Sequence, residues 1–260
     1  MPPIELPRLA EAQIVSFIAV LARVGGIFVF APVFSSRMIP ARAKLIAAGA
    51  IALAITPLAA PSGGLPTEPL ALVGLLGGEV LVGLGFALVI GLLAAAVQAA
   101  AGLLDTLVGF SFAAIVDPIS NAQTAVFGQF YSLLTVMVVL LSGGDRLIIR
   151  GLATSYELLP LGHVPSAGAL GELAASGLGT VAIVALEIAA PVVLALALVD
   201  AALGLVARAA PQINVFIVGL PAKILIGIMV VAASLPFVAR HVDGELERAV
   251  ENALRALGGG

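Results

Sequence analysis

Residues 208–223 read RAAPQINVFIVGLPAK and separate two long apolar segments near the end of the chain. This stretch places an arginine, two prolines, two amides and a lysine where almost all other side chains are apolar. Within a membrane, unpaired amides and backbone groups cost several kcal/mol each. A turn between two helices avoids that cost, because Pro211 ends the first helix while Gln212 and Asn214 cap exposed backbone groups. The sequence therefore predicts two membrane-length helices joined here by a short turn.

The composition places the whole chain in a membrane. Of its 260 residues, 61% are hydrophobic and 10% are charged, and the mean hydropathy is +1.20. A soluble domain of this size carries about a quarter charged residues. A water-exposed surface cannot be built from this composition, so the sequence predicts an all-α integral membrane protein that crosses the bilayer several times.

Several functional classes lack their sequence signals. The net charge is −3 without a basic run, so we expect no nucleic-acid binding. The chain has no cysteine, and His163 and His241 lie far apart, so we expect neither thiol chemistry nor a metal site. No serine-hydrolase, zinc-protease or nucleotide-binding motif is present. We expect a protein that is not an enzyme, with no catalytic residue and no cofactor.

The apolar pattern predicts about six long hydrophobic helices followed by an amphipathic tail at 243–257. The N-terminus lacks the pattern of a cleaved signal, so we expect the first segment to stay in the mature protein. The third segment would be about 52 Å long as one helix, against about 30 Å of hydrocarbon. The expected segments are 12–34, 41–60, 70–104, 124–142, 170–207 and 215–238.

Ionisable side chains inside these segments are a second signal. Arg23, Glu79, Glu187 and Asp200 form either a proton or ion relay or pairs that tie helices together, within the chain or between subunits. Their spacing resembles no transport motif, so both interpretations stay open. On the third segment, Gly83, Ala87 and Gly91 recur every four residues and predict a face on which another helix packs closely.

The stretch 105–121 is apolar but irregular, because Gly109 and the pair Asp117 and Pro118 interrupt it. An irregular backbone cannot face lipid, so we expect this stretch to lie in a cavity lined by protein.

The signature at 208–223 resembles that of the FliR family of flagellar type III export-gate proteins and, more distantly, the SctT, YscT and SpaR proteins of virulence secretion. Asp145 and Asn121 depart from the family, which often has histidine and glycine there. Further motifs of the family occur in order along most of the chain. They are Arg23 with Pro32, Pro40 and Lys44; Gly78 and Glu79 with Gly83; Gly109 to Pro118; Gly143 and Gly144; Ser155, Tyr156 and Pro160; and Glu187 with Pro191.

The resemblance implies an architecture and partners. It implies a FliP-like part at 1–167, a FliQ-like hairpin at 168–240 and a tail at 241–260. One such subunit would assemble with FliP-, FliQ- and FlhB-type proteins, beside an FlhA-type protein, in the inner (cell) membrane at the flagellar basal body. Unfolded flagellar proteins would pass through this gate, and membrane lipid would surround it.

The resemblance also implies two groups of functional residues. The first is a plug loop at about 109–121 that closes the gate by apolar packing, with Gly109, Phe110, Ser111, Phe112, Ile115, Asp117 and Pro118. The second serves subunit contacts or local structure and comprises Arg23, Glu79, Gly83, Gly91, Glu187, Arg208, Pro211, Gln212, Asn214, Phe216, Pro221 and Lys223.

A multi-pass transporter of small solutes is the alternative from another functional class. Such a fold predicts internal inverted repeats and a subunit that is stable alone. No repeat is visible in this sequence.

Overall fold

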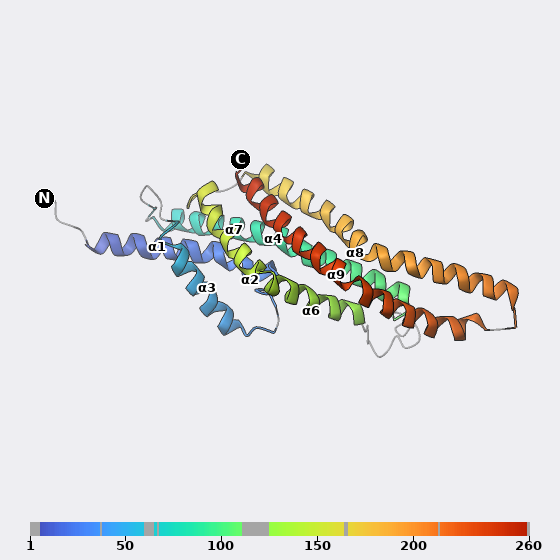
Figure 1. Cartoon of the computed structure of the whole chain (residues 1–260). Helices are drawn as coiled ribbons and strands as arrows, with labels where there is room; N and C mark the ends of the chain where they lie inside the picture. The colour runs from blue at the N-terminus through green and yellow to red at the C-terminus, as the bar shows by residue number, and fades with distance from the viewer. Residues whose placement is uncertain are drawn as a thin grey trace. The chain divides into compact units, whose positions relative to one another are not determined.

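The computed structural model describes residues 6–36, 38–59, 65–66, 68–110, 125–163, 166–212 and 214–258. All regular secondary structure in these ranges is helical (Figure 1), which confirms the expected fold class. The helices are α1 (Leu6–Gly25), α2 (Ile27–Phe30), α3 (Ala41–Ile55), α4 (Pro69–Val108), α6 (Val126–Leu141), α7 (Gly144–Leu158), α8 (Ala167–Ala209) and α9 (Val215–Gly258).

Within the described residues, four stretches of helix are long and apolar enough to cross a membrane: Gln13–Phe30, Pro69–Val108, Gly177–Ala209 and Ile217–Gly258. A fifth span exists if α6 and α7, which are bent by 69° at their junction, count as one broken span. The segment expected at 41–60 is too short in the structure to cross a membrane as one helix. Helix α3 has 15 residues, about 22 Å, whereas the hydrocarbon layer is about 30 Å thick. Pro57 has no N–H with which to continue the helix.

Three helices are longer than a membrane requires. Helices α4, α8 and α9 have 40, 43 and 44 residues, which corresponds to about 60–66 Å each. Helix α8 contains Pro191, and α9 contains Pro221 and Pro236, without ending there. The sixth expected segment and the expected tail are therefore one continuous helix, α9.

The chain divides into two compact units that are interleaved in sequence. The first comprises Met1–Leu92, Val139–Leu178 and Glu245–Gly260, and the second Leu93–Val138 and Gly179–Gly244. The family-derived boundaries at 167/168 and 240/241 do not follow this division and stay a prediction.

In the first unit, small residues bring helices together. Gly151 of α7 lies against Phe86 of α4 and Val250 of α9, and Gly144 lies against Leu246. The expected apolar face of the tail is therefore buried. Its members are Leu246, Ala249, Val250, Ala253 and Leu257, with Leu254 half-buried at the edge.

Among the described residues of the second unit, an ion pair and a histidine–carboxylate contact join α8 to α9. Lys223 Nζ lies 2.8 Å from Asp200 Oδ2, and His241 Nε2 lies 3.1 Å from Glu187 Oε2. Gly227 of α9 also packs against Val108 at the end of α4.

Candidate functional site

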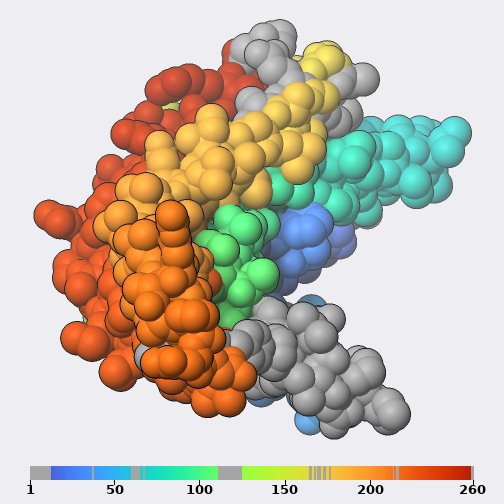
Figure 2. Space-filling view, turned by 90° about the vertical axis from the view of Figure 1, so that its right-hand side faces the viewer, coloured from blue at the N-terminus to red at the C-terminus, as the bar shows by residue number. Residues whose placement is uncertain are grey.

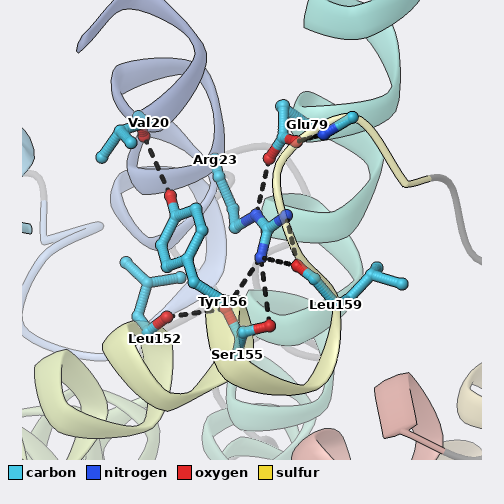
Figure 3. A network of polar contacts seen from close by, with 8 residues as sticks. Val20, Arg23, Glu79, Leu152, Ser155, Tyr156 and Leu159 are labelled. Carbon is cyan, nitrogen blue, oxygen red and sulfur yellow. Dashed lines mark hydrogen bonds and ion pairs between the residues drawn. The ribbon is translucent and has the colours of Figure 1, made fainter. Parts of the chain in front are cut away.

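Arg23 is fully buried in the first unit, although it carries a charge. It stands in the last turn of α1, and its side chain reaches α4 and the end of α7 (Figure 3). The guanidinium Nε donates to Glu79 Oε2 at 2.7 Å, and Glu79 is 1% exposed. A buried arginine is tolerated when it is paired and when its remaining donors are satisfied.

The remaining donors of Arg23 bind the end of α7. Nη1 donates to the carbonyl and hydroxyl oxygens of Ser155, both at 3.2 Å, and Nη1 and Nη2 donate to the carbonyl oxygen of Leu159 at 3.0 Å. The last carbonyls of a helix lack partners within that helix. The positive charge also stands where the dipole of α7 is negative. Arg23 therefore acts as a C-terminal cap that another helix supplies.

Three further contacts close the network. Glu79 Oε1 accepts the N–H of Gly162 at 2.9 Å, which fixes the turn after α7. The ring of Tyr156 covers the guanidinium, with its centroid 4.0 Å from Arg23 Cζ, and its hydroxyl donates to Val20 O at 3.4 Å. Such cation–π contacts stabilise a buried cation. Both carboxylate oxygens of Glu79 are bonded in this network, which ties α1, α4 and α7 together. The geometry therefore favours the interpretation of Arg23 and Glu79 as a pair that joins helices over that of a proton or ion relay.

The expected close-packing face of α4 also lies beside this network. A Cβ on Gly83 would stand 2.0 Å from the carbonyl oxygen of Arg23, and one on Gly26 would stand 2.2 Å from the carbonyl carbon of Gly83. A Cβ on Gly91 would stand 2.8 Å from the carbonyl oxygen of Phe30. Gly83 and Gly91 therefore face α1 and α2 of the same chain, with backbone against backbone.

In the second unit, Asp105 holds the start of α6. Its Oδ1 accepts the N–H of Phe127 at 2.9 Å, and its Oδ2 accepts the N–H of Gly128 at 3.1 Å. These are N–H groups of the first turn of α6, which have no partner within their own helix. A carboxylate is the favoured acceptor at a helix N-terminus. Asp105, which is buried near the end of α4, therefore fixes the ends of α4 and α6 to each other.

The expected plug loop begins at this junction. Gly109 follows the last residue of α4 and has a φ angle of +105°. Residues other than glycine rarely adopt this backbone conformation. The ring of Phe110 packs edge-on against Phe127 at 5.4 Å between centroids. The other five expected plug residues lie outside the described residues: Ser111, Phe112, Ile115, Asp117 and Pro118.

The signature at 208–223 forms the tip between α8 and α9, as the sequence predicts. Asn214 Oδ1 accepts the N–H of Ile217 at 3.3 Å and so caps α9. Arg208, Pro211 and Gln212 are exposed, and Figure 2 shows the end of α8 and the following turn, in orange, on the surface. Pro221 is exposed within the second turn of α9, and Lys223 forms its ion pair with Asp200. The side chain of Phe216 lies outside the described part.

Sequence reasoning missed several partners. It identified Glu187 but not His241, whose ring also stacks on Phe237 at 5.6 Å. It gave Asp105 no role, because Asp105 lies within α4 and caps a helix that begins 21 residues later. The backbone carbonyl groups of Ser155 and Leu159 could not be recognised as partners of Arg23 from the sequence, because every residue has such a group. In the part of the chain that the structure describes, no group of three or more His, Cys, Asp or Glu could hold a metal.

Comparisons with known proteins give a consistent result. The profile of the family described as bacterial export proteins, family 1, matches residues 14–249. The flagellar biosynthetic protein FliR of Bacillus subtilis is 32% identical over 250 residues, which cover 94% of this chain and 96% of that protein. FliR of Escherichia coli is 30% identical over 230 residues, covering 87% of each. The secretion system apparatus protein SsaT of Salmonella typhimurium is 31% identical over 170 residues, or 65% of each.

Proposed function

Since this chain belongs to the bacterial export proteins of family 1, we propose that it is a structural, non-catalytic subunit of a flagellar type III export gate. The main support for this proposal is the similarity to FliR of Bacillus subtilis, which extends over 94% of the chain. The likeness to the virulence-system protein SsaT covers less, 65%. The relatives are export proteins, so the comparisons do not favour the small-solute transporter.

The proposed setting follows from the resemblance and the apolar helices. The subunit would sit in the inner membrane at the flagellar basal body, with FliP-, FliQ- and FlhB-type proteins and an FlhA-type protein as neighbours. Large apolar side chains on α8 and α9 are exposed in the isolated chain, among them Leu194, Leu198 and Met229. Exposed apolar surface of this kind is typical of a subunit that packs against other subunits or lipid.

The proposed gate would work by packing and exclusion of water rather than by covalent chemistry. The loop at about 109–121 would close the channel through Phe110, Phe112 and Ile115, because an apolar constriction excludes water and ions. Two features of the described residues support a loop with a fixed base. Asp105 binds the start of α6, and Phe110 packs on Phe127.

Co-expression is the direct test of the export-gate assignment. Tagged chain, produced together with FliP- and FliQ-type proteins, is expected to purify as a discrete mixed complex with one copy of this chain by native mass spectrometry. An unrelated multi-pass transporter with the same tag serves as the control and should bring down neither partner. A chain that purifies alone, folded and monodisperse, would contradict the assignment.

The role of the loop base can be tested with Asp105→Ala. The substitution leaves two first-turn N–H groups without their charged acceptor, and hydrogen bonds to charged groups contribute about 1.5–3 kcal/mol each. With the start of α6 released, we expect the closed complex in planar bilayers to conduct ions more readily, with unchanged subunit composition. Glu247→Ala removes an exposed carboxylate and is the matched control. Equal conductance of wild type and Asp105→Ala in well-assembled complexes would argue against a gate closed at this loop.

A further inference from the structure

Helix α3 exposes several large apolar side chains in the first unit. Leu45, Ile46 and Leu53 are 73%, 74% and 68% exposed, although α3 contacts α1 and its Ala48 and Ala52 are buried. In Figure 1, the N-terminal end of α3 lies away from α1, and its C-terminal end lies beside α1. With 15 residues it is too short to span about 30 Å of hydrocarbon. Its charged side chains, Arg42 and Lys44, stand in the first turn, and residues 45–55 carry no polar side chain, so its N-terminal end suits the headgroups and the rest suits the acyl chains.

The charge around α3 has a single sign. Residues 12–67 contain Arg23, Arg37, Arg42 and Lys44 and no acidic residue, although the whole chain has a net charge of −3. Arg23 is neutralised by Glu79. Arg42 is exposed in the first turn of α3 and has no ion pair among the described residues. Lys44 donates to the carbonyl oxygen of Ser35 at 3.0 Å, a neutral partner that leaves its charge uncompensated.

We propose that the N-terminal end of α3 lies at the membrane–water interface and binds anionic phospholipid, with Arg42 and Lys44 at the headgroup phosphates and Leu45, Ile46 and Leu53 against the acyl chains. The charge is the observation that favours lipid as the occupant. Basic residues beside an anionic leaflet are attracted strongly enough to select acidic lipid, and this region has no acid of its own to compete. The proposal is independent of the export function, because it concerns only how this chain meets lipid.

The absence of tryptophan from the chain makes a direct measurement available. Leu45→Trp introduces a single tryptophan, which can be excited apart from the two tyrosines, at an exposed position of α3. The full-length chain with this substitution is reconstituted in two kinds of phosphatidylcholine vesicle. One contains a small fraction of dibrominated phosphatidylglycerol, and the other contains the same fraction of dibrominated phosphatidylcholine. We expect the brominated phosphatidylglycerol to quench the tryptophan with an apparent association constant higher by about fivefold or more.

Two charge variants in the Leu45→Trp background separate headgroup recognition from general contact with lipid. The double variant Arg42→Gln with Lys44→Gln is expected to lower the ratio of the two association constants, phosphatidylglycerol over phosphatidylcholine, toward one. Quenching by brominated phosphatidylcholine should stay unchanged. Arg146→Gln with Arg150→Gln removes the same charge from the exposed face of α7 and should keep the preference.

Three outcomes would overturn the proposal. The first is equal quenching by the two brominated lipids in the Leu45→Trp chain itself, which needs no charge variant and so no assumption about its folding. The second is a preference that survives the loss of Arg42 and Lys44. The third is a photoreactive side chain at Leu45 that, in native membranes, crosslinks to protein and not to lipid, because a protein would then cover this face.

Discussion

Gly83→Ala is expected to destabilise the folded chain by about 3 kcal/mol, the upper end of the range for an inserted methyl group in a packed interior. The added Cβ would stand 2.0 Å from the carbonyl oxygen of Arg23 and 2.8 Å from its carbonyl carbon. Both are backbone atoms, so no side chain can rotate away. Helix α1 would have to move as a body, and Arg23 would then be displaced from Glu79 and from the end of α7.

Gly77→Ala is the matched control on the same helix. No atom lies within 4 Å of a Cβ at Gly77, which is exposed. Alanine in an open helical position stabilises by about 0.5–1 kcal/mol relative to glycine. The two substitutions are therefore expected to shift thermal unfolding, followed by far-ultraviolet circular dichroism in detergent, in opposite directions. An unfolding temperature for Gly83→Ala at or above that of Gly77→Ala would contradict the close approach of α1 and α4.

Most helices could be predicted because the apolar runs are long and their interruptions are strong. The third segment, expected at 70–104, is α4 at Pro69–Val108, and the fifth, expected at 170–207, is α8 at Ala167–Ala209. Pro211 and Asn214 mark the turn by backbone chemistry that acts locally. The sequence is less informative where one pattern continues through a boundary. The tail at 243–257 has its own amphipathic period, yet it continues α9 without a break.

The polar contacts could be predicted only in part, because a sequence shows which side chains need partners but not which partners they find. Arg23 and Glu79 are recognisable as buried ionisable residues on two different helices. Their other partners are backbone groups of Ser155, Leu159 and Gly162, and backbone groups carry no residue-specific signal. Asp105 and His241 were missed for a related reason, since each acts on an element distant in sequence.

The second large effect is expected from Arg23→Met, which should destabilise the chain by about 3–5 kcal/mol because it leaves the Glu79 carboxylate buried without its counter-charge. Ser155 Oγ and Leu159 O lose the donors that Arg23 supplies, and Ser155 O keeps only the N–H of Leu159. Arg23→Lys keeps the charge but not the planar fork of donors, so it should restore only part of the stability. The measurement is the unfolding temperature and the yield of folded chain in detergent.

The pair of Lys223 with Asp200 provides the control, since it has almost the same contact distance, 2.8 Å, but its side chains are 19% and 52% exposed. Exposed pairs contribute about 0–1 kcal/mol, so Lys223→Met should change the unfolding temperature little in the isolated chain. A loss as large as that for Arg23→Met would show that burial is not what makes the Arg23 pair important.

The double variant Arg23→Met with Glu79→Leu distinguishes an unpaired charge from lost anchoring. Replacing a buried ion pair with apolar residues of similar size is often neutral or even stabilising, so the double variant should be more stable than Arg23→Met alone. Recovery should nevertheless be incomplete, because the carbonyl of Leu159 and the N–H of Gly162 lose partners that an apolar side chain cannot replace. Complete recovery would mean that the cap on α7 contributes nothing. Strictly additive losses would mean that the two charges do not interact in the folded chain.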